Sequence, residues 1–264
     1  MNSPREEVTF VARSENRVAV LSTMDDRPIT RTDLEERANV SRVTLGRILA
    51  DFEDRGWVEE TGGGYNRTPT GEMVAGALDE LFETIAVARK LDSVVQWLPT
   101  EEMPFDLQRL GSADVTLPGP ADPAAPTRRA GQRLRDTVHV RLLMSVIVAE
   151  VVEACWDATV NGNQQFEGVF TPEVAETMVT DPTMSAQVAE MVQTDQVTIY
   201  LTEEPFPFIQ GLLDDIVAFG VTDEENLPRA YFETQDETVR AWVESTYTHY
   251  RNRAEEVTPE SFGF

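Results

Sequence analysis

The chain has 264 residues, 41% of them hydrophobic, which is enough for one large domain or two smaller ones. No apolar run approaches the roughly 20 residues that a membrane-spanning helix needs, and this excludes an integral membrane protein. Residues 1–10 are charged and lack the apolar core of a signal peptide, so we predict a cytoplasmic protein with no membrane partner. The single cysteine, Cys155, excludes an internal disulfide and any site held by several cysteines.

Acidic residues outnumber basic ones by 47 to 22, which gives a net charge of −25. Lys90 is the only lysine, and the other basic residues are arginines. This composition is typical of a halophilic protein, because a Debye length of about 3 Å in molar salt makes such a charge density tolerable. Taken over the whole chain, the charge argues against a nucleic-acid partner.

The acidity is unevenly distributed along the chain. Residues 1–70 hold ten arginines and thirteen carboxylates, a net charge of −3, whereas residues 71–264 carry −22. The first seventy residues are therefore nearly neutral, and the global charge does not exclude them from DNA binding. Four prolines within residues 117–127 predict an extended connector further along.

The beginning of the chain predicts short helices. Apolar residues before Met24 recur at helical spacing and allow one amphipathic helix or two short ones. Thr32 and Glu35 fit a capping box that opens the next helix, which we expect to end near Ala38. A tight turn at residues 39–40 would follow, and this is the order of a helix-turn-helix.

The third helix is the predicted recognition helix. Ser41 is a suitable N-cap, and the helix is expected to run to about Arg55. Arg42, Thr44 and Arg47 project near its N-terminal end, where such helices enter the major groove of DNA. Its apolar stripe is expected to consist of Val43, Leu45, Ile48, Leu49 and Phe52.

Residues 57–61 and 65–68 predict two strands joined by the glycines at 62–64, which permit a reversal with positive φ. A helix-turn-helix followed by a hairpin is a winged helix, and residues 1–70 form this predicted DNA-binding domain. A winged helix used only for protein contact remains the alternative. The predicted DNA-contacting residues are Arg31 on the backbone, Ser41, Arg42, Thr44 and Arg47 in the major groove, and Asn66 and Arg67 on the wing.

Residues 71–98 predict one long amphipathic helix. Such an apolar stripe needs a partner, which is either a second subunit or the rest of the same chain. The first option makes the protein a homodimer that binds paired half-sites. The stripe comprises Val74, Leu78, Leu81, Ile85, Ala88, Leu91 and Val95.

Residues 99–264 alternate strand-like and helix-like segments, which predicts a regulatory domain with a mixed α/β sheet. The expected strands are 113–117, 138–148, 165–170, 197–202, 206–210, 216–221 and 230–233. The expected helices are 150–160, 172–180, 184–193 and 237–254.

Spaced patterns over nearly the whole chain resemble haloarchaeal winged-helix transcriptional regulators. In the first part these are residues 12–17, 47–49 and 54–58, with Tyr65 and 68–71. Residues 127–130, 205–207, Val239, Trp242, Tyr250 and Arg251 are similar to the C-terminal domain named from a regulator of filament formation in methanogenic archaea. The resemblance implies a DNA-binding regulator whose C-terminal domain senses an effector or dimerises.

A looser resemblance, to the sensor half of sugar-responsive archaeal regulators of the TrmB type, would make the sheet similar to that of the phospholipase D superfamily. An enzyme of that superfamily needs a histidine and a lysine in close spacing. Lys90 lies on the predicted linker helix, and His139 and His249 are 110 residues apart. We therefore predict no enzyme activity, no cofactor and no metal site.

The remaining acidic and polar candidates give only a weak indication of a ligand site. Asp214 and Asp215 are adjacent between two strands and are expected to form a solvated turn rather than an acid/base pair. Sheets of this kind bind ligands at the carboxyl ends of their strands, which suggests Ser145, Tyr200 and Asp214 as an effector pocket. Cys155 is expected to be a small core residue, with a redox-sensing thiol as the alternative.

Overall fold

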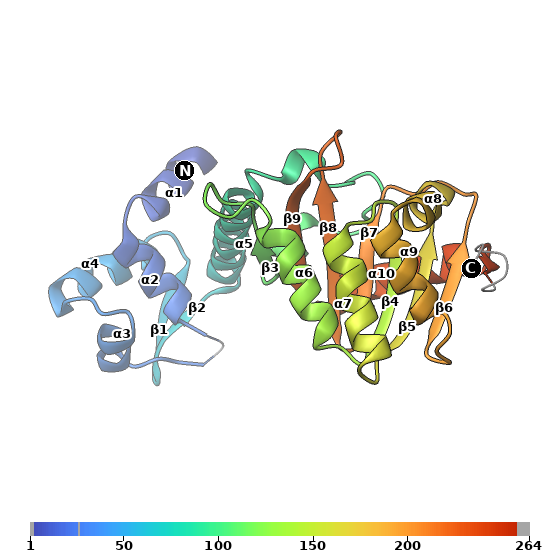
Figure 1. Cartoon of the computed structure of the whole chain (residues 1–264). Helices are drawn as coiled ribbons and strands as arrows, with labels where there is room; N and C mark the ends of the chain where they lie inside the picture. The colour runs from blue at the N-terminus through green and yellow to red at the C-terminus, as the bar shows by residue number, and fades with distance from the viewer. Residues whose placement is uncertain (1–2, 26, 258–264) are drawn as a thin grey trace. The chain divides into compact units, whose positions relative to one another are not determined.

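The computed structural model describes residues 3–25 and 27–257, and the chain divides into two compact units, Met1–Ala86 and Val87–Phe264 (Figure 1). The boundary falls within one helix, α5 (Pro69–Leu91). The first unit is a winged helix and the second is a mixed α/β domain, as predicted. None of the helices in the described ranges combines the length and hydrophobicity that crossing a membrane requires.

The first unit packs short helices around one apolar core. Leu21, Leu34, Leu45 and Phe52 are fully buried in it. Ser14 caps the second helix by accepting a hydrogen bond from the Arg17 amide, so the segment before residue 24 forms two helices rather than one. The elements are α1 (Pro4–Ala12), α2 (Glu15–Thr23), α3 (Arg31–Arg37), α4 (Arg42–Glu53), β1 (Val58–Thr61) and β2 (Gly64–Arg67).

The predicted capping box at Thr32 and Glu35 is wrong by two residues. Thr30 has an extended backbone, and its hydroxyl accepts the Asp33 amide at 3.2 Å, so helix α3 begins at Arg31. Thr30 and Thr32 are equally good N-cap residues. Thr30 takes this role because the preceding residue, Ile29, pairs with Tyr65 of the hairpin and so fixes where the chain turns into the helix. The tight turn at residues 39–40 is confirmed, since Asn39 has a φ of 51°.

Helix α5 contributes to the cores of both units. Ala75 and Leu78 are buried in the first unit, and Val87 and Leu91 are buried in the second. The helix ends seven residues earlier than the predicted 98. A short 3-10 turn, Val95–Trp97, follows, and the residue before Pro99 is held in an extended conformation, as the proline ring requires.

The second unit contains a mixed sheet. Within the described residues it has eight strands in the order β10-β6-β5-β4-β7-β8-β9-β3. Strands β4, β5 and β6 are parallel, and the other pairs are antiparallel. The strands are β3 (Asp114–Thr116), β4 (His139–Met144), β5 (Gln165–Phe170), β6 (Val197–Leu201), β7 (Ile209–Leu213), β8 (Ile216–Thr222), β9 (Pro228–Thr234) and β10 (Glu255–Glu256).

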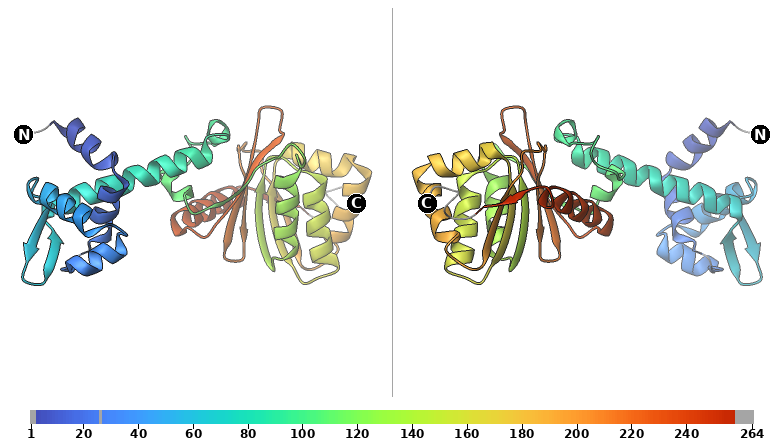
Figure 2. Two further views of the ribbon diagram at one scale, coloured as in Figure 1. Left: turned by 90° about the vertical axis from the view of Figure 1, so that its left-hand side faces the viewer. Right: turned by 90° about the vertical axis from the view of Figure 1, so that its right-hand side faces the viewer.

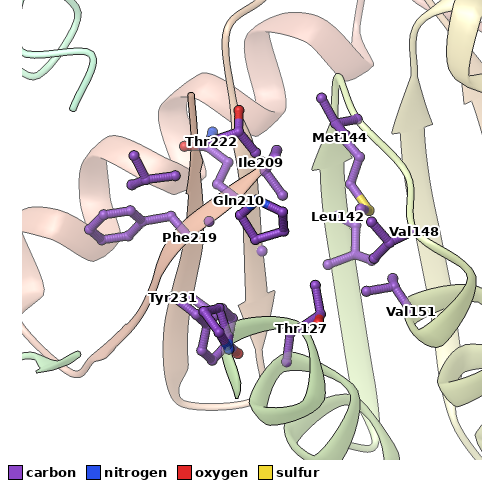
Figure 3. A pocket seen from close by; sticks show the side chains of 18 of the residues that line it. Thr127, Leu142, Met144, Val148, Val151, Ile209, Gln210, Phe219, Thr222 and Tyr231 are labelled. Carbon is purple, nitrogen blue, oxygen red and sulfur yellow. The ribbon is translucent and has the colours of Figure 1, made fainter. Parts of the chain in front are cut away.

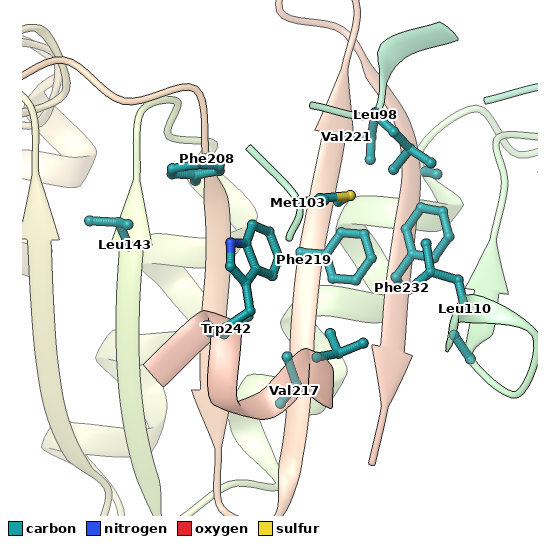
Figure 4. Packing of buried hydrophobic residues seen from close by; sticks show 14 of the residues in the cluster. Leu98, Met103, Leu110, Leu143, Phe208, Val217, Phe219, Val221, Phe232 and Trp242 are labelled. Atoms are coloured by element: carbon teal, nitrogen blue, oxygen red, sulfur yellow. The ribbon is translucent and has the colours of Figure 1, made fainter. Parts of the chain in front are cut away.

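Helices cover both faces of this sheet. Figure 2 shows α6 and α7 on one face and α10 on the other. The α10 face holds an aromatic core in which the Phe208 and Trp242 rings are 5.7 Å apart and the Phe219 and Phe232 rings 4.5 Å apart (Figure 4). The helices are α6 (Ala125–Arg135), α7 (Ala149–Val160), α8 (Pro172–Thr180), α9 (Pro182–Met191) and α10 (Glu237–Arg251).

Several expectations for this unit need correction. The strand expected at 138–148 ends at Met144, because Val148 already serves as the N-cap residue of α7. Helix α6 was not predicted, and its first residues fall inside the connector expected at 117–127. Pro126 lies in the first turn of α6, where a proline loses no hydrogen bond and its fixed φ suits the helix. Strand β7 starts at Ile209 rather than at 206, because Pro207 cannot donate to a ladder.

Candidate nucleic-acid interface

The N-terminal end of α4 is fixed by a local hydrogen-bond network. The Ser41 hydroxyl accepts the Thr44 amide at 3.3 Å and lies 2.9 Å from the Thr44 hydroxyl. Both predicted contact residues are therefore already bonded to each other, and their first role is to define where α4 begins. The other amides of the first turn remain without helical partners, and helix N-termini of this kind attract anions.

Three neighbouring side chains project outward from this end of α4. Arg42 and Arg47 are exposed, and neither forms an ion pair with any residue in the described ranges. Val43 lies between them and is 68% exposed. The prediction that Val43 belongs to the buried stripe of α4 is wrong, because the inward face of the helix consists of Leu45, Ile48, Leu49 and Phe52.

Arg31 bridges α3 and α4. Its Nη2 donates to the Arg42 carbonyl at 3.4 Å, and its Nε is 3.7 Å from a Glu35 carboxylate oxygen. The guanidinium lies across Gly46, which has no side chain to displace it. Arg31 thus adds positive charge beside the start of α4 while it links the two helices.

Asn66 and Arg67 lie at the base of the wing rather than at its tip. Arg67 is opposite Val58, the first residue of β1, and its side chain is only 12% exposed. Its Nε is 2.7 Å from a Glu72 carboxylate oxygen, so the charge of this arginine is balanced within the domain. The sequence indicated the hairpin correctly, but it gave no signal that Glu72 pairs with this residue.

The structure does not bring the three predicted effector residues together. Ser145 follows β4 and donates its hydroxyl proton to the Phe208 carbonyl at 2.9 Å. Asp214 lies at the other end of β4, where its carboxylate accepts the His139 amide. Tyr200 belongs to the core on the α10 face and accepts a hydrogen bond from Arg251.

A pocket that the sequence did not suggest lies on the opposite face of the sheet (Figure 3). It is lined by α6, α7 and strands β4, β7, β8 and β9, and none of Ser145, Tyr200 and Asp214 is part of it. The signal in the sequence was Gly220, which lies inside the strand expected at 216–221; Gly211 comes directly after the strand expected at 206–210. Glycines in strands mark places where another group approaches the backbone closely.

The structure shifts the pKa of two titratable groups that the sequence analysis singled out, Cys155 and Asp214. The Cys155 thiol is buried, and burial raises its pKa to about 12. Burial acts to raise the pKa of Asp214, but hydrogen bonds from the Val138 and His139 amides outweigh this and lower it. No group of three or more potential metal ligands occurs in residues 3–25 and 27–257. The thiolate that nucleophilic chemistry needs is thus disfavoured at Cys155.

Both parts of the chain match known domain families. Residues 5–90 match the HVO_A0261 N-terminal domain, and residues 123–253 match the middle domain of the methanogenesis regulatory protein FilR1. The chain thus combines an HVO_A0261-type N-terminal domain with a FilR1-type domain. Helix α4 lies in the HVO_A0261-type domain, and the apolar pocket lies in the FilR1-type domain.

Solved structures give more distant similarities. TrmBL2, an archaeal chromatin protein, is 12% identical over 95% of this chain and 97% of its own, with a TM-score of 0.41. Nuc from Salmonella typhimurium, a phospholipase D family member, is 10% identical, with a TM-score of 0.42, over 56% of this chain and 99% of its own. NucT from Helicobacter pylori is also 10% identical, with a TM-score of 0.41, over 55% and 99%. A comparison with curated proteins finds no match.

Proposed function

We propose that this chain is a cytoplasmic, homodimeric transcriptional regulator that binds double-stranded DNA through the N-terminal end of α4. The FilR1 match supports transcription regulation, because FilR1 is named as a regulatory protein. The observation that carries DNA binding is the exposed set Arg42, Val43 and Arg47, with two unpaired guanidinium groups on either side of an apolar side chain.

The chemistry of this set suits the edges of bases. A major groove admits one α-helix, and an arginine there binds the O6 and N7 atoms of guanine with two hydrogen bonds. An exposed valine contacts the methyl group of thymine. Ser41 and Thr44 hold the first turn in place, and Asn66 and Arg67 support the base of the wing. Arg31, which donates to the Arg42 carbonyl, would contact the phosphate backbone.

An exposed apolar face on α5 supports the dimer. Ala75 and Leu78 cover the core of the first unit, and the next residues on the same side of the helix, Leu81, Phe82 and Ile85, are exposed. We propose that these three residues pack against their copies in a second chain. Two recognition helices related by a two-fold axis would then bind two half-sites of DNA.

The charge distribution favours reading of bases over attraction to phosphates. Residues 1–70 have a net charge of only −3, so non-specific attraction to DNA is small. In the molar salt for which the composition is suited, the remaining attraction is screened within about 3 Å. Base contacts and shape then supply most of the affinity.

The experiment compares two double variants of equal charge. A site is first selected from random DNA by the parent protein in molar potassium chloride. Arg42→Ala with Arg47→Ala is expected to weaken binding to this site by at least tenfold, because each bidentate base contact contributes about 1–3 kcal/mol. Arg5→Ala with Arg13→Ala removes the same charge near α1, which packs at the far end of α4 through Glu7 and Arg55, and should bind like the parent.

Two outcomes contradict this proposal. Equal affinity of both double variants would show that α4 does not read the site. Failure of the parent to enrich any sequence, together with chromatin mapping that shows no sequence-defined sites, would favour a winged helix that binds only proteins.

A further inference from the structure

The floor of the pocket in the FilR1-type domain is apolar. Gly211 lies directly opposite Ala218 across the β7–β8 pair, and Gly220 is the next residue on the same side of β8. Neighbouring side chains cover the two glycines: Leu142 Cδ2 lies 2.6 Å from where a Cβ atom of Gly211 would be, and Ile209 Cγ2 lies 3.3 Å from that of Gly220. These aliphatic side chains therefore face the pocket between α6 and α7 (Figure 3). The cavity has a volume of about 90 Å³ and opens toward solvent, so a ligand with more than one ring would lie partly in the mouth of the pocket.

The lining of the pocket carries no charge. None of its residues is Asp, Glu, Lys or Arg, in a chain whose net charge is −25. An anion or a phosphorylated metabolite would lose its hydration there without gaining a counter-charge, and a sugar would leave most of its hydroxyls unpaired. The apolar walls are Leu134, Leu142, Met144, Val148, Val151 and Ile209.

One buried polar group does line the pocket. Tyr231 is 7% exposed, and its hydroxyl makes no hydrogen bond of good geometry within the described residues. Burial, and then the nearby Glu233 carboxylate, raise the pKa of Tyr231, so the hydroxyl keeps its proton and remains a donor. The nearby Glu233 carboxylate already accepts hydrogen bonds from Arg129 and Arg133. A buried donor without a well-aligned acceptor costs free energy, and an acceptor oxygen on a ligand would reduce that cost.

Gln210 is the other buried side chain near the pocket whose polar atoms make no hydrogen bond within the described residues, and it lies on the other face of the sheet. Gln210 is paired across the sheet with Leu143 and Phe219, both of which belong to the core under α10. Its amide therefore lies on that side, and only its backbone contributes to the floor. Tyr231 is left as the buried donor of this pocket.

We infer that the pocket binds a neutral, flat, mostly apolar molecule with one or two rings and a carbonyl oxygen, which accepts the hydrogen bond of Tyr231. The aliphatic side chains of the lining fit the face of a ring, and the absence of charge in the lining fits a neutral molecule. The inference rests on the proposed function only in treating this ligand as the effector of the regulator.

The first test measures binding of prodan, a neutral naphthalene with one carbonyl group whose emission shifts to the blue in apolar surroundings. The full chain in molar potassium chloride is expected to bind one prodan per chain with saturation. Ala130→Leu fills the pocket from α6 and should weaken binding at least tenfold. Gln132→Leu adds the same side chain at an exposed position of α6 and should leave binding unchanged.

The second test isolates the hydroxyl. Tyr231→Phe keeps the ring and is expected to weaken prodan binding about fivefold to tenfold. It should leave binding of N-phenyl-1-naphthylamine, which has no oxygen, within twofold of the parent. Circular dichroism of every variant must match the parent for the comparison to count.

Absence of saturable prodan binding by the parent would overturn the inference, and so would equal binding by Ala130→Leu and Gln132→Leu. An equal loss of both probes in Tyr231→Phe would overturn the role of the hydroxyl. Neither probe requires DNA, so failure of the pocket and failure of DNA binding are seen separately.

Discussion

The Nη2 atom of Arg31 lies 2.6 Å from the point where a Cβ atom at Gly46 would be. This side chain crosses from α3 to the carbonyl of Arg42 on α4, and it can do so only because residue 46 has no side chain. Gly46 is helical rather than in the left-handed region, so its identity is explained by this crossing and not by backbone conformation.

A double-mutant cycle tests the link between Arg31 and Gly46. Alanine in place of a helical glycine usually stabilises a helix by about 1 kcal/mol. In an Arg31→Ala background we expect Gly46→Ala to raise the free energy of unfolding by this full amount. In the parent the increase should be smaller, because the Arg31 guanidinium must move away from the new Cβ atom. Chemical denaturation measures the four free energies of unfolding. Additive effects would show that the two residues do not interact.

Val43→Ser tests the exposed apolar residue of the recognition helix. Stability should change by less than about 0.5 kcal/mol, because the side chain is exposed. Affinity for the selected DNA site should fall about fivefold. The variant should lose the preference of the parent for one A·T pair and keep its preferences at the other base pairs. Binding to a panel of single-base variants measures this. Ala50→Ser, at an exposed position further along α4, is the control and should retain the preference of the parent.

Ile85→Glu tests the dimer interface proposed on α5. A carboxylate in an apolar interface would be desolvated without a partner, so we expect the mass in solution to fall to the 29.5 kDa of one chain. Gly76→Glu adds the same charge on the other side of α5, where a new Cβ would meet nothing within 4 Å, and should remain dimeric. Light scattering after size exclusion measures both. A parent that is itself monomeric at micromolar concentration would contradict the proposed dimer.

Glu233→Gln tests the attachment of α6 to β9. The Glu233 carboxylate is buried and accepts hydrogen bonds from Arg129 at 2.6 Å and from Arg133 at 2.8 Å. Removing its charge should lower the free energy of unfolding by about 2 kcal/mol. Urea denaturation at neutral pH measures the loss. Glu237→Gln removes a charge from the exposed start of α10 and is expected to change stability by less than about 0.5 kcal/mol.

The same carboxylate predicts a dependence on pH. Burial acts to raise the pKa of Glu233, but the hydrogen bonds and charges of Arg133 and Arg129 outweigh it and lower the pKa below the ordinary value. The stabilisation is therefore complete above the ordinary glutamate value of about 4.3 and is lost as the pH falls through the lower value of the folded state. Below that value the parent and Glu233→Gln should unfold at converging urea concentrations. A difference that persists there would contradict the assignment.

Cys155 should be unreactive in the folded protein. Because burial raises its pKa to about 12, almost no thiolate is present at neutral pH. We expect an aromatic disulfide reagent to label less than a tenth of the chains in an hour and one thiol per chain in denaturant. Fast labelling of the folded protein would support the alternative of a redox sensor.

Local signals in the sequence predicted most of the first unit. The turn at Asn39, the cap at Ser41 and the glycines of the hairpin each act within a few residues, so they could be read without knowing the fold. The start of α3 was placed incorrectly because Thr30 and Thr32 are both good caps. Val43 was assigned to the core because periodicity alone does not say how wide the buried face of a short helix is.

The second unit was harder, because its site depends on strand order. The parallel β4–β5–β6 and the antiparallel β7–β8–β9 meet at the β4–β7 pair, and no local pattern reveals that contact. Ser145 and Asp214 were expected to be close, yet they lie at opposite ends of β4. Helix α6 was not predicted, because it follows prolines and is rich in arginine. Its inner face carries only Leu134 and two small residues, Ala130 and Gly131, so it shows no clear apolar stripe.

Helix α6 forms one side of the pocket, and its ion pairs differ in how they respond to salt. Arg128 with Asp122 and Arg135 with Asp157 are exposed, so molar salt screens them, whereas Glu233 is buried and its attraction to Arg133 persists. In concentrated salt the attachment of α6 therefore depends on the buried Glu233 and on the packing of Pro126 and Leu134, which lie near its two ends.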